Sequence, residues 1–210
     1  MAPKPQWEGE FNEEGLPHGV GKMSYPKVRT GEEEEEEEEE DDEDELVVGD
    51  MYEGPMVNGV REGKGKYTFQ RGGYYEGDYI DNKKHGKGII KFPDGGTYEG
   101  EWAENKMHGR GFYIYANGDM YEGDFVNGEK HGKGSYFHKA VETQFIGDWE
   151  NGHFVKGVWL HKDGSRFEGD FTESRPTSGL FTFQRPRLKQ LGEFQGNGLW
   201  APKEELKHSE

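Results

Sequence analysis

The segment Tyr75-Glu76-Gly77-Asp78-Tyr79 decides the fold, because its pattern returns along the chain at a nearly constant spacing. Close copies begin at Tyr98 and Tyr121, and looser copies lie on both sides of these three. The central glycines of the copies are Gly9, Gly54, Gly77, Gly100, Gly123, Gly147, Gly169 and Gly192. Their spacings are 45, 23, 23, 23, 24, 22 and 23 residues. A constant spacing of this size is typical of a repeat architecture, here with a period of 23 residues.

A second motif, His-Gly-x-Gly, follows the first one in several repeats. Its copies begin at His18, His85, His108 and His131, and the second repeat has Glu62 in place of the histidine. In the later repeats only a single glycine of this motif remains. Each period therefore holds two short motifs separated by polar residues.

The two motifs predict one β-hairpin per repeat. Tyr74–Ile80 alternates aromatic residues or glycine with acidic or aliphatic residues, a period of two that is typical of a strand. We expect the second strand at Gly86–Phe92, after a polar link at residues 81–84. Pro93-Asp94-Gly95-Gly96 is a strong turn signal. The predicted fold is all-β: an elongated single-layer antiparallel sheet of about eight stacked β-hairpins.

Aromatic residues and glycines recur together for a physical reason. A lone hairpin is marginal in water, whereas stacked hairpins share hydrogen bonds and cover one another. A glycine, which has no side chain, leaves room for a facing ring. We expect the ring at the end of the first motif to form a row across the sheet: Phe11, Met56, Tyr79, Trp102, Phe125, Trp149, Phe171 and Phe194.

One acidic block stands apart from the repeats. The chain has a formal charge of -17, and residues 32–45 are fourteen consecutive acids. The remaining residues carry 29 acids against 26 bases. Since the block falls inside the 45-residue interval, we expect a disordered acidic loop inserted in a repeat sheet that spans residues 7–198, followed by a tail at residues 199–210.

The composition excludes several classes of protein. The chain has no cysteine, so a disulfide framework and thiol catalysis are excluded. No apolar run approaches the roughly 18 residues of a membrane span, and residues 1–6 give no sign of a secretory signal. Nucleic acid is not an expected partner, because phosphate binding needs clustered Lys and Arg.

The polar residues of the motifs do not predict a catalytic, cofactor or metal site. Equivalent histidines in adjacent hairpins lie about 9.5 Å apart, too far for a row of four to converge on one ion. We expect them to act as turn residues. Glu76 and Asp78 share a face, but this pair recurs along the chain, whereas a catalytic pair is normally unique. Cross-strand charge pairs with Lys87 or Arg110 explain it better. We therefore expect no enzyme.

The repeats resemble the MORN family, whose repeat carries Tyr-x-Gly-x-Trp followed by His-Gly-x-Gly. Residues 75–134 match this pattern closely, and the resemblance extends over residues 7–198. Among MORN proteins, a short acidic chain made almost entirely of repeats is similar to a radial spoke head protein of motile cilia and flagella. The resemblance implies a structural scaffold subunit in the cytoskeleton of the axoneme, which passes signals between the central pair and the dynein arms.

The partners that this resemblance implies are other radial spoke head proteins and the central-pair apparatus, in a hetero-oligomeric assembly. The candidate partner-binding residues come from the acidic block and the aromatic row: Glu32, Glu36, Glu40, Asp42, Glu45, Tyr79, Trp102, Phe125 and Trp149. The alternative is a MORN-type adaptor that binds phospholipid. Its cationic stretches, residues 83–84 and 185–189, are short, and the acidic block repels an anionic surface.

The sequence makes one prediction about the acidic block. Deletion of residues 32–45 removes charge from a loop and no residue of a repeat, so we expect the melting temperature, followed by far-UV circular dichroism, to stay within a few degrees of that of the intact chain. A collapse of thermal stability would show that the block is part of the folded structure.

Overall fold

The computed structural model describes residues 4–27, 48–185, 187–196, 198–204 and 207–208 of the chain. These residues form strands and turns and contain no helix. They fall into two compact units, residues 1–95 (unit 1) and residues 96–210 (unit 2). The acidic block, residues 32–45, lies outside the described residues.

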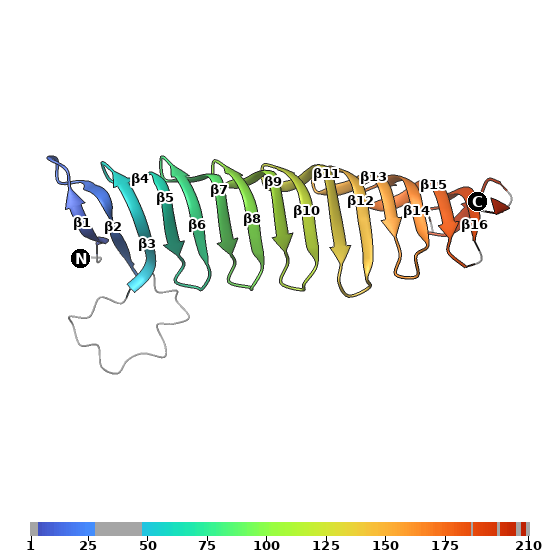
Figure 1. Ribbon diagram of the computed structural model, residues 1–210, viewed down its shortest axis with the longest axis horizontal. Coiled ribbons are helices and arrows are strands. Elements are labelled where there is room, and N and C mark those ends of the chain that lie inside the picture. The colour runs from blue at the N-terminus through green and yellow to red at the C-terminus, as the bar shows by residue number, and fades with distance from the viewer. Residues whose placement is uncertain (1–3, 28–47, 186, 197, 205–206, 209–210) are drawn as a thin grey trace, which may run out of the picture. The chain divides into compact units, whose positions relative to one another are not determined.

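Unit 1 is an antiparallel sheet in which the strands pair in chain order (Figure 1). A short strand, β4, pairs with β3 beside β5. The strands are β1 (Gln6–Phe11), β2 (Pro17–Pro26), β3 (Val48–Val57), β4 (Val60–Arg61), β5 (Gly63–Thr68), β6 (Tyr74–Ile80) and β7 (Lys83–Lys91).

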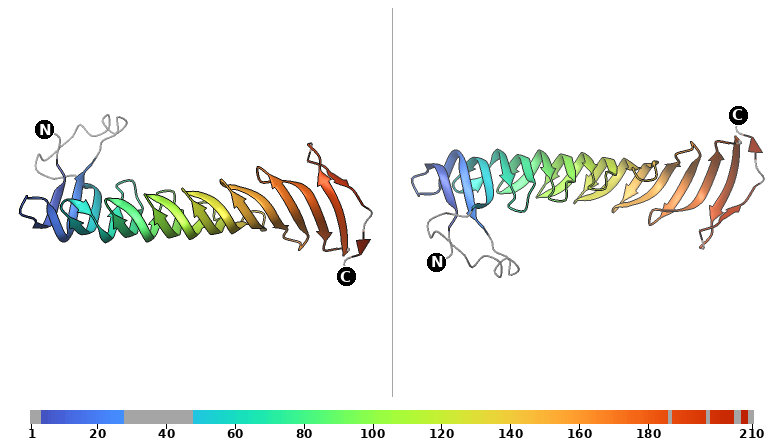
Figure 2. Two further views of the ribbon diagram at one scale, coloured as in Figure 1. Left: turned by 90° about the horizontal axis from the view of Figure 1, so that it is seen from above. Right: turned by 90° about the horizontal axis from the view of Figure 1, so that it is seen from below.

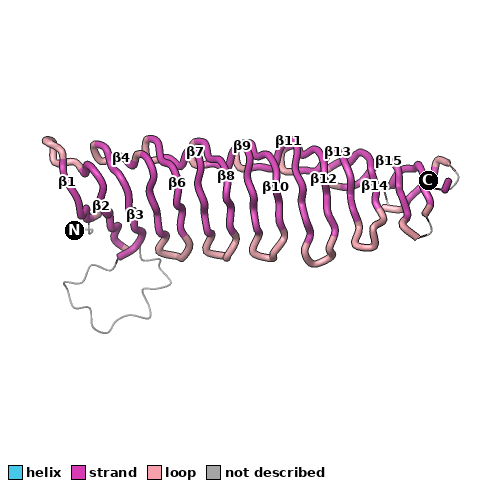
Figure 3. The backbone as a smooth tube through the Cα atoms, in the orientation of Figure 1, coloured by secondary structure: helices cyan, strands magenta, loops and turns pink. Residues whose placement is uncertain are grey.

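Unit 2 follows the same plan: strands β8 to β16 pair in chain order, and β17 and β18 both pair with β16. Its strands are β8 (Thr97–Ala103), β9 (Lys106–Ile114), β10 (Met120–Val126), β11 (Glu129–His138), β12 (Thr143–Glu150), β13 (His153–Leu160), β14 (Arg166–Thr172), β15 (Arg175–Phe183), β16 (Leu188–Phe194), β17 (Trp200–Pro202) and β18 (Lys207–His208). In both units the loops are confined to the ends of the hairpins (Figure 3). The predicted fold class, an antiparallel sheet of one hairpin per repeat, is confirmed.

The turn inside each hairpin is shorter than we expected. The second strand of the third repeat begins at Lys83, so the turn is only Asp81-Asn82, and both residues have positive φ angles, 48° and 64°. Two central residues with positive φ define the type I′ turn, whose twist suits a two-residue hairpin. Equivalent turns use Asn58-Gly59, Glu104-Asn105 and Asn127-Gly128. The expected four-residue link was wrong because Lys83 and Lys84 pair with Ile80 and Tyr79 and so belong to the second strand.

A bulge in the second strand explains the His-Gly-x-Gly motif. In the third repeat Asp78 lies opposite His85 and Gly77 lies opposite Gly88, so Gly86 and Lys87 have no opposite residue. Gly86 has a φ of 57°, a conformation that favours glycine. The first glycine of the motif is therefore required by the bulge and the second by the ring described next.

An aromatic ring lies over the paired glycines of each well-formed repeat. A Cβ atom added to Gly77 would lie 2.6 Å from the hydroxyl oxygen of Tyr75, and one added to Gly88 would lie 2.6 Å from Cζ of its ring. Tyr52, Tyr98 and Tyr121 cover equivalent glycine pairs. The strands are strongly coiled (Figure 2), and a sheet one layer thick buries Tyr52, Tyr75, Tyr98 and Tyr121 completely. The inner face of each unit is thus its hydrophobic core.

The ring-over-glycine contact predicts a steep cost for a single methyl group. In Gly134→Ala the new Cβ would lie 2.6 Å from Cε2 of Tyr121, so we expect the free energy of unfolding in urea to fall by about 1–3 kcal/mol. Gly196→Ala is the control, because a Cβ there meets nothing within 4 Å. Equal stability of the two variants would contradict the proposed packing.

Candidate interaction surface

The aromatic residues predicted to bind a partner lie in the buried inner face. Tyr79, Trp102, Phe125 and Trp149 are only 2%, 5%, 2% and 6% exposed. Each meets neighbouring rings edge to face, as Phe125 meets Tyr121 with ring centroids 5.1 Å apart. Their established contacts are therefore with the core. That they bind a partner stays a prediction, and their burial directs attention to other surfaces.

Three cations extend into this aromatic face. In unit 1 the guanidinium of Arg61 lies 5.1–5.7 Å from the ring centroids of Tyr52, Tyr67 and Tyr79. Lys84 lies 5.2 Å from the ring centroid of Tyr75. These cation–π contacts compensate part of the cost of removing a charge from water. Burial lowers the pKa of Lys84. This lysine, counted above among the lipid-facing cations, is turned inward.

Unit 2 has an equivalent cation, Lys130. Its ammonium group lies 4.6 Å from the ring centroids of both Tyr136 and Trp149. Burial lowers the pKa of Lys130 as well. Its position in the repeat matches that of Arg61 and Lys84, directly after the hairpin turn, so the cations follow the 23-residue period.

The recurring acids hold the bulges in place. Oδ2 of Asp78 accepts a hydrogen bond of 3.1 Å from the backbone N–H of Lys87, inside the bulge. Asp124 accepts the equivalent bond from the N–H of Lys133, and Glu101 accepts it from the N–H of Arg110. A carboxylate at this position satisfies a backbone donor that the bulge removes from the strand ladder. The acids of the first motif therefore have a structural use in each hairpin.

The predicted cross-strand charge pairs are present, but with a different choice of partner. Lys64 Nζ lies 3.0 Å from Asp78 Oδ1, and Arg110 lies 3.5 Å from Asp124. Each cation comes from the hairpin before the acid, and the backbone N–H of Arg110 donates to Glu101 in its own hairpin. The hydrogen bond from Lys64 lowers the pKa of Asp78. These pairs are exposed, so each contributes little to stability.

The four motif histidines lie at the bulges, next to the motif acids. His85 is opposite Asp78 and His131 is opposite Asp124 in the strand register. Nδ1 of His18 is buried and has no hydrogen-bond partner. Among the described residues, no three His, Cys, Asp or Glu side chains gather as they would around a metal ion. The described residues also include no helix that could cross a membrane.

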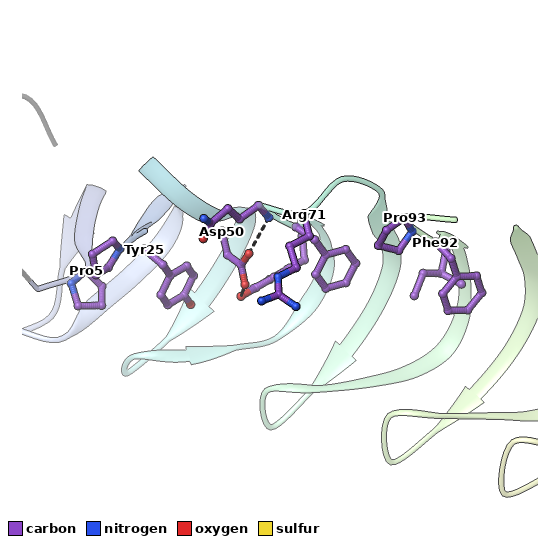
Figure 4. Close-up of a pocket in the computed structure, with 11 residues that line it drawn as sticks. Pro5, Tyr25, Asp50, Arg71, Phe92 and Pro93 are labelled. Carbon is purple, nitrogen blue, oxygen red and sulfur yellow. Dashed lines mark hydrogen bonds between the residues drawn. The ribbon is translucent and has the colours of Figure 1, made fainter. Parts of the chain in front are cut away.

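A second set of rings lies near the turns that join the hairpins and borders a hollow in unit 1 (Figure 4). The hollow has a volume of about 800 Å³ and a mostly apolar lining that includes Tyr25, Phe69 and Phe92. Asp50 and Arg71 supply its charged groups. A smaller hollow of about 440 Å³ in unit 2 is lined in part by His161. Burial lowers the pKa of His161.

The sequence analysis missed an acid that ties the start of a hairpin to its second strand and to the turn that follows. In unit 1 Asp50 accepts hydrogen bonds of 2.7 Å from the Tyr67 hydroxyl and from the backbone N–H of Gln70 (Figure 4, dashed line). In unit 2 Asp119 plays the same part with the Tyr136 hydroxyl, at 2.8 Å, and the backbone N–H of Lys139, at 2.9 Å.

Asp119 is the more completely enclosed of these two acids. Its residue is 3% exposed, and its carboxylate also accepts a bond from the Asn117 side chain and lies 3.1 Å from His138 Nδ1. Burial alone would raise the pKa of Asp119, but the hydrogen bonds from Lys139, Tyr136 and Asn117 hold it below its ordinary value. The only sequence signal was an aspartate two residues before a motif aromatic, as at Asp50.

The pKa of Asp119 predicts a dependence of stability on pH. Because its folded pKa is depressed, its contribution is complete above the unfolded pKa of about 4 and is lost as the pH falls through the folded value. Asp119→Asn should therefore lower the free energy of unfolding at pH 7 by about 1–3 kcal/mol and by less at pH 3. Urea unfolding at both pH values measures this. Glu150→Gln, at an exposed site, is the control, and an Asp119→Asn effect equal at both pH values would contradict the assignment.

Comparison with known proteins places these features in a family. The family model described as MORN repeat matches residues 7–27, 52–74, 75–97, 98–120 and 121–138, which together make up more than half of the chain. The comparison with curated proteins found no match.

One similar solved structure is the TCP domain of SAS-4 (dCPAP) from Drosophila melanogaster, in complex with a proline-rich motif of Ana2 (dSTIL). The match has 12% identity and a TM-score of 0.26, and it covers 98% of this chain and 97% of that one. At this TM-score nothing about the ligands of the present chain follows. The family match rests on the same motifs that place the rings, glycines and bulges: the chain belongs to the MORN-repeat family.

Proposed function

We propose that this MORN-repeat chain is a non-enzymatic scaffold subunit of the radial spoke head of motile cilia and flagella. One observation carries the scaffold role: the recurring acids of the motif accept hydrogen bonds from the backbone of their own hairpins, as Asp78 does from Lys87 and Asp124 does from Lys133. The chemistry that repeats along the chain is used to build the sheet. What the chain offers to other molecules is an extended surface.

The assignment to the spoke head rests on the family and on charge. A chain made almost entirely of MORN repeats resembles the small spoke head subunits, and the acidic block at residues 32–45 would attract a basic surface. In this proposal the sheet docks to other spoke head subunits, and the block faces the central-pair apparatus. The protein would then belong to the axoneme and contribute to the passage of signals to the dynein arms.

Localisation and capture test this proposal together. A tagged chain expressed in a ciliated cell should label the axoneme, and a pull-down from detergent-extracted axonemes should recover spoke head subunits identified by mass spectrometry. Deletion of residues 32–45 should keep the spoke head subunits and lose central-pair proteins, because only the charged block is removed. A tagged chain that stains the cytoplasm or the plasma membrane and leaves axonemes unlabelled would contradict the proposal.

The competing role, phospholipid binding, has its own measurement. A lipid adaptor would sediment with vesicles that contain phosphatidylserine, would lose this binding as salt is raised, and would be weakened by the double variant Arg185→Glu/Arg187→Glu. We expect no sedimentation above that seen with neutral phosphatidylcholine vesicles. Salt-sensitive binding that the double variant abolishes would favour the adaptor over the scaffold.

A further inference from the structure

The outer faces of the two units differ in a way that the repeat does not require. In unit 1 the row of directly opposite residues on the outer face alternates in charge from β1 to β6 and ends in an isoleucine on β7: Glu8, Lys22, Glu53, Lys66, Glu76 and Ile89. Such a ladder is the ordinary solvated face of an antiparallel sheet. Because the core of each unit lies on the inner face, neither the rings nor the glycines constrain these outer positions.

In unit 2 the same row becomes apolar. From β12 onward it carries Ile146, Val158, Leu180 and Leu191, interrupted on β14 by Glu168. A second outer row, two residues away along each strand, contributes Phe137 on β11 and Leu160 on β13. We call these six apolar residues the outer strip. Ile146 is 45% exposed and Leu191 is 41% exposed, and the other four residues of the strip are half-buried.

The polar groups around the outer strip are already satisfied. The Gln144 side-chain amide donates a hydrogen bond of 2.7 Å to Ser135 Oγ across β11 and β12. A third outer row pairs its own charges, Lys133 with Asp148 at 2.6 Å and Lys156 with Asp170 at 3.6 Å. Removing water from this surface costs little free energy, because its polar groups keep their partners. A surface of this kind is suited to an apolar contact.

The sheet is also flatter where the strip lies. In Figure 2 the strands at the orange-to-red end of unit 2, β13–β16, open into a broader and less tightly coiled surface than β8–β11. Two such faces pack as in a β-sandwich, with the strands crossing at about 30° because both sheets are twisted. The contact is therefore expected to centre on a few strands, around β13 and β14.

The charges on β14 indicate which molecule covers the outer strip. Arg166 and Glu168 are two residues apart on this strand, one in each outer row, and both are exposed. A two-fold axis that lies between the facing sheets and runs across the strands exchanges the two rows. It sets Glu168 of one copy opposite Arg166 of the other, twice, and sets Val158 opposite Leu160. A surface with one charge of each sign in exchangeable rows is complementary to itself.

We propose that the outer strip of unit 2 binds a second copy of this chain, so that the protein forms a symmetric dimer with its outer faces in contact. The inner aromatic faces of both copies stay free of this contact. A dimer would present two sets of the remaining surfaces to a larger assembly.

Sedimentation equilibrium of the full-length chain in about 0.15 M salt tests the dimer, since mutual repulsion of the acidic copies is screened there. The average mass should rise from 24.0 kDa toward twice that value between about 1 and 100 μM chain. Ile146→Lys should weaken the association by at least about tenfold, because it places a charge in the apolar contact. Ile89→Lys is the matched control, as Ile89 is a 41% exposed isoleucine of the equivalent row in unit 1.

A charge exchange distinguishes a dimer of this symmetry from non-specific association. Arg166→Glu and Glu168→Arg should each weaken the dimer, because each sets like charges opposite one another. The double variant should restore it, because both pairs form again with their signs reversed. Far-UV circular dichroism and melting temperatures confirm that every variant is folded.

Cross-linking checks the register of the two copies. Because the chain has no cysteine, Val158→Cys and Leu160→Cys each introduce a single thiol. A mixture of these two variants under mild oxidation should give more of the disulfide between different variants than of either symmetric product. A chain that stays monomeric at 100 μM, a loss of association equal in Ile89→Lys and Ile146→Lys, or a double charge variant as weak as the single ones would each overturn the proposal. Monomeric behaviour would assign the strip to a different protein.

Discussion

The contact between an aromatic ring and a pair of opposite glycines is the constraint on which the rest of the structure depends. A sheet one layer thick has no second layer to cover its hydrophobic face, so it must curve until that face covers itself. Gly77 and Gly88 leave the space in which the Tyr75 ring lies, and the Tyr75 hydroxyl donates a hydrogen bond to the carbonyl of Asp78. Tyr75 thereby fills the core and also holds, through this hydrogen bond, the strand that curves around it.

The polar residues of the repeat follow from this curvature. A strongly bent strand needs a bulge, a bulge leaves a backbone N–H without a ladder partner, and the motif acid accepts it. This sequence of requirements explains why histidine, glycine and acid recur together without forming a catalytic or metal site. The features that vary between repeats therefore carry the information about function: the acidic block, the inner cations Arg61, Lys84 and Lys130, and the outer faces.

Much of the fold was predictable because its signals are local. The 23-residue period, the alternation in Tyr74–Ile80 and the pairing of rings with glycines all lie within one repeat. The turn at Asp81-Asn82 was mispredicted because the polar residues Lys83 and Lys84 belong to the second strand, where they pair with Ile80 and Tyr79. Asp119 was missed because its backbone donor, on Lys139, lies at the far end of the hairpin, twenty residues along the chain. The burial of Tyr79 was not evident because curvature of a sheet leaves no pattern in the sequence.

Within each unit, every strand pairs with a strand close to it in the chain, an uncommon arrangement for an all-β protein. Sandwiches and barrels fold slowly because distant segments must meet before their contacts form. Here most hairpins close over two turn residues, and the next hairpin adds to the edge just made. The entropy lost in closing most of these loops is small and similar, and only the connection between β2 and β3, residues 27–47, is much longer. The chain is thus expected to fold rapidly for its class and to tolerate gain or loss of a whole period without any change of topology.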